Sequence, residues 1–210
     1  MSAIMRFLLI ILLFFPAINI LSQDIQLPPP LKEAGMPLME ALNRRQSTRS
    51  FADLDLPVQT LSNLLWAAWG INRPDVTKRT APSANNGQNI ELYCALRNGL
   101  YIYDAFNNSL ILVIPEDIRA ATGTQEYVGS AAMNIVFVAK GENAINWTEA
   151  EKKSACVNAA FIAQNVYLFC ASEGLGCVVR GSFDGQKLQE LMKLGNDKTV
   201  VLAQSVGYPG

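Results

Sequence analysis

The chain of 210 residues is long enough for one domain, and 50% hydrophobic against 17% charged residues is typical of a globular protein. With 17 basic and 18 acidic side chains there is no overall positive charge to bind nucleic acid, so we expect no nucleic-acid partner. The sequence has no histidine, which excludes Ser-His-Asp and Cys-His nucleophiles, imidazole zinc sites and histidine general bases. Chemistry without imidazole indicates carboxylates or a cofactor that carries its own reactive atoms.

Residues 1–22 have the pattern of a secretory signal peptide. Arg6 precedes the unbroken apolar run 7–15, and Pro16 and Asn19 interrupt it before the roughly 20 apolar residues that a membrane-spanning helix needs. A retained N-terminal anchor is the alternative interpretation. We therefore expect cleavage after residue 22 and export to the periplasm or the extracellular space, with no membrane contact by the mature chain.

The mature chain is predicted to contain an extended N-terminal arm, 23–36, and one domain, 37–210. The arm holds three consecutive prolines and few core candidates, so we expect it to be extended and able to wrap a partner subunit. The domain begins with a helix from Leu38, which ends in the basic, hydroxyl-rich segment 44–51.

The middle of the chain alternates helical and strand patterns. A second helix is predicted from Pro57 to Gly70, and the polar loop 82–89 leads into a hairpin of strands 90–97 and 100–103. The remaining short elements are a strand or apolar turn at 111–114, a helix at 115–122, a buried strand at 135–139, a strand at 177–179, a helix at 184–194 and a last strand at 199–206.

The longest segment without a helix breaker, 147–172, is predicted as a helix capped by Thr148. Its middle, 155–170, is apolar on nearly every side, and such a helix is buried at a domain centre or in a subunit interface. Helices that alternate with strands, some of which form a hairpin, predict a mixed α+β fold with one three-layer core.

The four cysteines show neither a CxxC pair nor metal-ligand spacing, so we interpret them as buried thiols and expect no metal site. Cys170 and Cys177 are the closest pair in sequence. Export would permit a disulfide between them, but the spacing alone does not fix the geometry.

Three segments could bind a ligand. Segment 45–49 places two guanidinium groups and two hydroxyls within five residues, which suits a phosphate or a solvated helix end. The amides of loop 82–89 suit a heterocycle edge or sugar hydroxyls, or an ordinary surface connection. The glycines of 174–181 let backbone amides approach a flat ligand, or they are turn residues. No GxGxxG or GxxxxGK[ST] motif is present.

Taken in order, these segments resemble the FMN-dependent nitroreductase family, most closely its branch of SagB-type oxidases. The similarity extends over residues 36–209. The motifs are RRQSTRSF at 44–51, APSANNGQ at 81–88, AQNV at 163–166 followed by GLGCVVRGSFD at 174–184, and VGYP at 206–209.

The resemblance implies a three-layer α/β/α sandwich with a central, mainly antiparallel sheet. It implies an intertwined homodimer with two FMN molecules at the subunit interface and the long helices 147–172 packed together. The implied function is an exported FMN-dependent oxidoreductase that works by a ping-pong mechanism. Hydride or electrons pass through flavin N5, from NAD(P)H or another donor, to a nitroaromatic, a quinone or a similar small acceptor. Alternatives are a SagB-type flavin-linked dehydrogenase or oxidase that uses oxygen, and a non-catalytic flavin-binding protein.

The same resemblance implies cofactor-binding residues and no catalytic side chain, because FMN carries the chemistry. Arg45, Ser47 and Arg49 match the residues that bind the phosphate and the flavin pyrimidine. The other implied contacts are Gln46 to phosphate or ribityl oxygens, Asn86 to the ribityl chain and flavin edge, and the backbone amides of Arg180 and Gly181 to flavin N5 and O4.

Three departures from the family pattern are visible. Asn89 stands where some members have a lysine, so the charge near the pyrimidine is expected mainly from Arg49. The sequence ends at Gly210 without the basic residue that many members place after the last strand, so no C-terminal phosphate contact is assigned. The Lys-Tyr motif associated with azoline oxidation in the SagB branch is not visible.

Overall fold

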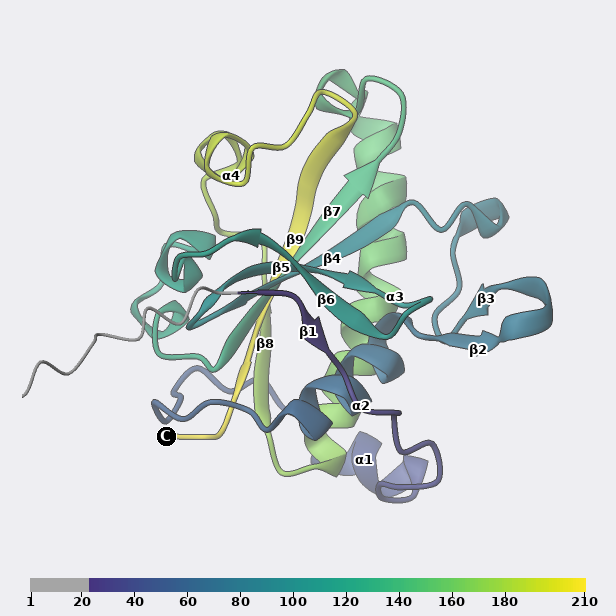
Figure 1. The fold of residues 1–210 in the computed structure, drawn as a ribbon, viewed down its shortest axis with the longest axis vertical. Coiled ribbons are helices and arrows are strands. Elements are labelled where there is room, and N and C mark those ends of the chain that lie inside the picture. The colour runs from purple at the N-terminus through teal and green to yellow at the C-terminus, as the bar shows by residue number, and fades with distance from the viewer. Residues whose placement is uncertain (1–22) are drawn as a thin grey trace, which may run out of the picture.

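A computed structural model describes residues 23–210, and the predicted signal peptide lies outside the described residues (Figure 1). The described chain builds one large sheet with the strand order β1-β6-β5-β4-β7-β9-β8, in which neighbouring strands run antiparallel. The strands are β1 (Ile25–Gln26), β4 (Ile90–Leu96), β5 (Gly99–Asp104), β6 (Ser109–Ile114), β7 (Met133–Lys140), β8 (Gly176–Arg180) and β9 (Lys198–Gly207).

Helices lie on both faces of this sheet (Figure 1). α2 (Val58–Trp69) and α3 (Glu149–Ser172) cover one face, and α1 (Leu38–Arg44) contacts α3. α4 (Gly185–Leu191) packs on the other face, after the N-cap Asp184. The structure therefore confirms the predicted three-layer α+β arrangement.

Alternate side chains of β7 enter the two hydrophobic cores, one on each face of the sheet. Phe137 is fully buried on the face that packs against Ile162 of α3, and its neighbour Val136 is fully buried on the face that packs against Leu188 of α4. Successive side chains of a strand point to opposite faces, so a strand buried on both sides reads as a continuous apolar run.

α3 is the long helix that the sequence predicts, and a capping box fixes its start. The Oγ1 atom of Thr148 accepts a hydrogen bond from the Glu151 amide at 3.3 Å, and the Thr148 amide donates to Oε2 of Glu151 at 2.7 Å. One side of α3 is buried, whereas Val157 and Phe161 on its outer side are 47% exposed. α3 is also long and apolar enough to cross a membrane, a property that core helices of soluble proteins share.

The N-terminal arm packs on its own chain. β1 pairs with β6, and Leu27 is a core residue at 3% exposure. At the other end of the arm, the Met36 amide donates to Oγ of Ser172 at 2.8 Å. The apolar side chain of Leu27 thus contributes more to the core than the proline-rich composition of the arm indicated.

Two local expectations differ from the structure. A small hairpin of β2 (Ile71–Arg73) and β3 (Lys78–Arg79) occupies a region for which no element was predicted. The predicted helix at 115–122 is only a 3₁₀ turn, Arg119–Thr122. The carboxylate of Asp117 accepts hydrogen bonds from the amide and the guanidinium of Arg119, and such local bonds compete with helix formation.

We predict that Thr148→Ala lowers the free energy of unfolding by about 1 kcal/mol, because the first turn of α3 loses its cap. Urea denaturation followed by circular dichroism measures the change. The control is Thr124→Ala, at an exposed position outside the helices, for which the change should stay within about 0.5 kcal/mol. Equal losses in the two variants would contradict a role for the cap.

Candidate functional site

The basic segment 45–49 lies along the outer edge of β8, immediately after α1. The Thr48 amide donates to the Cys177 carbonyl oxygen at 2.9 Å. A Cβ atom at Gly176 would lie 2.7 Å from the Thr48 side chain, closer than real Cβ contacts come. Glycine at 176 therefore lets the basic segment approach β8, and two of the predicted ligand-binding segments become neighbours.

Tyr167 of α3 joins these two segments. Its hydroxyl lies 2.9 Å from Oγ of Ser47 and accepts a hydrogen bond from the Val179 amide at 2.9 Å. The guanidinium of Arg45 lies 5.3 Å from the centroid of the Tyr167 ring. Tyr167 was not among the predicted site residues. The signal that could have found it is its position directly after the 163–166 motif, since a buried tyrosine hydroxyl usually has a partner.

Arg44, at the end of α1, and the two arginines of segment 45–49 differ in their partners. Arg44 forms an ion pair with Glu40 one turn earlier in α1, at 2.5 Å. Within residues 23–210, neither Arg45 nor Arg49 forms a salt bridge. Arg45 and Arg49, which lie on either side of Ser47 in the sequence, thus have no carboxylate partner among these residues. This set of donors suits a phosphate, which takes bidentate guanidinium bonds and further hydroxyl donors.

Gln46 occupies a different place from Ser47. With Arg44 and Thr48 it lines a cavity of about 370 Å³ next to Gly174 and Leu175. Side chains alternate in direction along an extended backbone, which is why this set and the set of Arg45, Ser47 and Arg49 separate. The structure therefore groups Arg45 with Ser47 and places Gln46 at the adjoining cavity.

The backbone at the end of β8 offers an open hydrogen-bond donor. The amide of Gly181 donates to no acceptor in the described part of the chain, and a Cβ atom at this residue would meet nothing within 4 Å. The side chain of Arg180 points away into the protein, with a residue exposure of 4%. Of these two residues, it is thus the exposed Gly181 whose backbone is open to a ligand.

Loop 82–89 is fixed against the first half of α3. Oδ1 of the buried Asn158 accepts a hydrogen bond from the Ala84 amide at 3.0 Å, and its Nδ2 donates to Oδ1 of Asn89 at 3.1 Å. The backbone of Asn86 is left-handed, with a φ of 54°, a conformation that asparagine tolerates better than most residues. Asn86 is exposed, and its Oδ1 accepts a hydrogen bond from Gln88 at 3.3 Å.

α3 contacts both loop 82–89, through Asn158, and segment 45–49, through Tyr167. Asn158 precedes Tyr167 by nine residues, which corresponds to about 13 Å along a helix axis. Within the described residues, no hydrogen bond joins Asn86 to segment 45–49 or to 180–181. The structure thus places segment 45–49 beside β8 through Tyr167, and loop 82–89 beside Asn158, about 13 Å away along the same helix.

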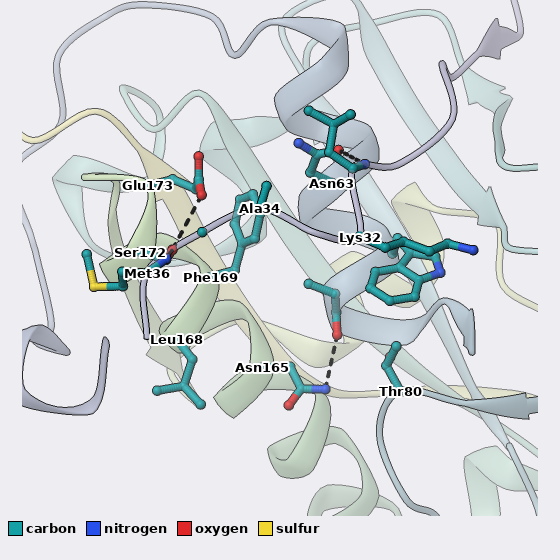
Figure 2. A pocket seen from close by; sticks show the side chains of 14 residues that line it. Lys32, Ala34, Met36, Asn63, Thr80, Asn165, Leu168, Phe169, Ser172 and Glu173 are labelled. Carbon is teal, nitrogen blue, oxygen red and sulfur yellow. Dashed lines mark hydrogen bonds between the residues drawn. The ribbon is translucent and has the colours of Figure 1, made fainter. Parts of the chain in front are cut away.

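Two further cavities do not include the basic segment. One of about 310 Å³ lies where the N-terminal arm, α2 and α3 meet, and it is lined by Lys32, Asn165 and Phe169 among others (Figure 2). None of the predicted site residues lines it. A larger cavity of about 610 Å³ adjoins loop 82–89, where the guanidinium of Arg79 lies 4.8 Å from the Trp69 ring centroid.

The cysteines and acidic residues of the described chain do not form a metal centre: no group of three or more His, Cys, Asp or Glu residues that could hold a metal ion occurs in residues 23–210. Cys170 and Cys177 are both buried free thiols. Burial also raises the pKa of Cys94 to about 12, so this thiol stays protonated at neutral pH.

Comparison with known proteins gives consistent results. The family model described as "Nitroreductase family" matches residues 42–208. The crystal structure of a "putative nitroreductase" from Ralstonia eutropha JMP134 is 41% identical, with a TM-score of 0.85 and 93% of each chain covered. A curated protein of Methanocaldococcus jannaschii, "Putative nitroreductase MJ1384", is 27% identical over 82% of this chain and 91% of its own length.

A more distant structure shares the fold. The "FMN-dependent Nitroreductase" of Clostridium difficile R20291 is 18% identical, with a TM-score of 0.55, covering 81% of this chain and 87% of its own. The sheet and helices described above are therefore those of the nitroreductase fold.

We predict that Tyr167→Phe lowers the free energy of unfolding by about 1–3 kcal/mol, because the Val179 amide and the Ser47 hydroxyl lose their shared partner. Chemical denaturation measures the loss. Tyr208→Phe is the matched control, since Tyr208 is also partly buried against the core but its hydroxyl bonds to no described residue. A Tyr167 variant as stable as this control would show that the phenol bridge contributes nothing.

Proposed function

Because the chain belongs to the nitroreductase family, we propose that it is an oxidoreductase that binds FMN between segment 45–49 and the end of β8. The observation that carries this proposal is the position of Tyr167, whose hydroxyl contacts Ser47 and the Val179 amide and whose ring lies beside Arg45. These contacts hold Arg45 and Ser47 next to β8, which ends one residue before Gly181. A phosphate donor set and an open backbone amide thus lie at neighbouring positions of one chain.

The phosphate end of the ligand fits segment 45–49. Arg45 and Arg49 provide two positive charges that form no salt bridge with a carboxylate in residues 23–210, and Ser47 provides a hydroxyl that Tyr167 orients. Charge-assisted hydrogen bonds to phosphate are about twice as strong as neutral ones. Gln46 contributes from the adjoining cavity, on the other side of the extended backbone.

The ring end of the ligand fits the backbone at 180–181. The open space above Gly181 admits a flat group, and its free amide can donate to a ring nitrogen or carbonyl oxygen. Bound FMN would supply the hydride and electron transfer, which accounts for redox chemistry in a chain without histidine. Asn86, held at the other end of α3, is our proposed contact for the sugar-like chain.

We propose a small aromatic electron acceptor, such as a nitroaromatic or a quinone, with NAD(P)H or another hydride donor. Transfer through the flavin requires the acceptor to lie against the ring at about 3–3.5 Å. We therefore propose that it binds over the open space at Gly181, where a Cβ atom would meet nothing within 4 Å.

We also propose a homodimer formed through α3. Val157 and Phe161 are each 47% exposed on one side of a helix whose other side is buried. Nearby, α1 exposes Leu38 and Met39, at 62% and 75%, beside the helix that it contacts. Large exposed apolar patches usually mark interaction sites. Two copies joined along α3 would place the predicted FMN sites at their shared boundary.

For the cofactor, we predict that the purified protein binds FMN and that replacing both Arg45 and Arg49 by alanine raises the dissociation constant at least tenfold. Each lost charge-assisted hydrogen bond costs about 1.5–3 kcal/mol, and about 1.4 kcal/mol corresponds to tenfold. Quenching of FMN fluorescence measures the constant. Arg44→Ala is the control, because Glu40 already occupies that guanidinium; equal weakening by this change would contradict the assigned phosphate site.

Anaerobic assays distinguish the rival functions. Bleaching of bound FMN by NADPH, followed by reoxidation with nitrofurazone or a quinone, supports the reductase. Bleaching by another donor with reoxidation only by oxygen supports a SagB-type dehydrogenase or oxidase. FMN that is retained but never bleached indicates a non-catalytic flavin-binding protein, and a wild-type protein that takes up no FMN contradicts the proposed function.

For the dimer, we predict that Phe161→Glu shifts the protein to a monomer, because a charge on the open face of α3 would have to be desolvated at the interface. Analytical ultracentrifugation measures the molecular mass. Phe106→Glu is the matched control, since Phe106 is 69% exposed at the turn between β5 and β6. A wild-type monomer, or the same dissociation in both variants, would rule out this interface.

A further inference from the structure

Arg180 places a positive charge inside the protein directly before Gly181. Its residue exposure is 4%, and its guanidinium donates to the Thr122 carbonyl oxygen at 2.8 Å and to Oδ1 of Asn134 at 3.1 Å. A weaker bond at 3.4 Å reaches Oγ1 of Thr122. All of these acceptors are neutral.

No carboxylate neutralises this charge within residues 23–210, and Nε of Arg180 is a buried donor without a partner. The other fully enclosed arginine, Arg119, has the same exposure of 4% but forms an ion pair with Asp117 at 2.8 Å. Burying an unpaired charge is costly, so the difference between the two arginines indicates a role for Arg180 beyond packing.

Backbone and side-chain groups from several elements enclose the guanidinium and fix its orientation. A Cβ atom at Gly123 would lie 2.0 Å from Nη1 of Arg180, so the backbone there closes directly over the charge. Asn134 is oriented from two sides, because its Oδ1 also accepts from Oγ of Ser205 at 2.6 Å and its Nδ2 donates to the Val128 carbonyl oxygen at 2.9 Å. The amide oxygen therefore faces the guanidinium in a fixed geometry.

Arg180 remains charged at neutral pH in this environment. Burial lowers the pKa of its guanidinium to about 10, with a small opposing effect from Tyr127. Because this pKa is still above 7, the protonated form dominates at physiological pH. A charge in such a site is screened much less than a surface charge.

We propose that Arg180, a positioning residue that does not touch the flavin, raises the reduction potential of the flavin bound at Gly181 through the charge of its buried guanidinium. The inference rests on the proposed FMN site. Two-electron reduction adds electron density to the ring, and a fixed cation behind the backbone amide that contacts it stabilises the reduced form. The electrons come from the hydride donor, or from dithionite in the test below. Arg180 neither gains nor loses a proton or an electron.

The decisive variant is Asn134→Asp, which puts a carboxylate of nearly the same shape where the amide oxygen accepts from Arg180. It neutralises the charge and keeps the guanidinium, but it also replaces the Nδ2 donor to the Val128 carbonyl by an oxygen. We expect the equilibrium constant for reduction of bound FMN to fall at least tenfold, which is a fall of about 30 mV for a two-electron couple. Spectroscopic titration against a reference dye measures it, and Arg180→Met should shift it in the same direction. Asn134→Leu loses the same donor without adding a negative charge, and it should not lower the constant.

Two controls separate charge from structure. Ser205→Ala removes a hydrogen bond to the same oxygen of Asn134 without changing the charge, so the constant should stay within about twofold. Arg180→Lys keeps the charge and should fall between the wild type and the Met variant. Urea unfolding of each variant reports any loss of the fold, and Asn134→Asp decides the matter if Arg180→Met does not fold.

Variants that bind FMN with the wild-type potential, or a shift of equal size in Ser205→Ala, would overturn the inference and leave Arg180 a purely structural residue. A wild-type protein that binds no FMN is a different failure, since it removes the proposed cofactor itself. The two failures are therefore distinguishable in the same experiment.

Discussion

The hydroxyl of Tyr167 is the contact on which the geometry of the site depends. It lies where α3, β8 and the basic segment 45–49 meet, and it bonds to both Ser47 and the Val179 amide. β8 is an edge strand, and its outer edge is covered by this phenol and by the Thr48 amide. The bonds that cover this edge also fix the position of the basic segment, so the same contacts that complete the fold shape the proposed ligand site.

Much of the fold was predictable because local pattern and tertiary environment agree. The hairpin of β4 and β5, the buried strand β7 and the helix α3 follow directly from a turn dipeptide, an apolar run and a capping box. The exceptions have two different causes, a distant strand partner and a local hydrogen bond. β1 is only two residues long and exists because β6 lies beside it, and the turn at Arg119 replaces a helix because Asp117 bonds to it locally.

The sequence predicted which segments form the candidate site, but it did not predict the direction of every side chain in them. The order of motifs identified 45–49 and 180–181, and the structure brings these two segments together. The order of motifs could not reveal that the Arg180 side chain turns inward while the next residue, Gly181, is exposed, because that direction is set by strand alternation and by Asn134 on β7. Nor could it identify Asn158, whose role depends on a loop 69 positions away along the chain.

α3 has a consequence for how the protein behaves on dilution. Its 24 residues span about 36 Å as one rod, carrying Asn158 and Tyr167 on the inner side and Val157 and Phe161 on the outer side. A partner that covers the outer side of α3 also restrains the helix that positions Asn158 and Tyr167 in the proposed ligand site. In the proposed dimer, binding of the proposed ligand and association of the subunits are thermodynamically linked, so the affinity for that ligand should rise with the concentration of the protein itself.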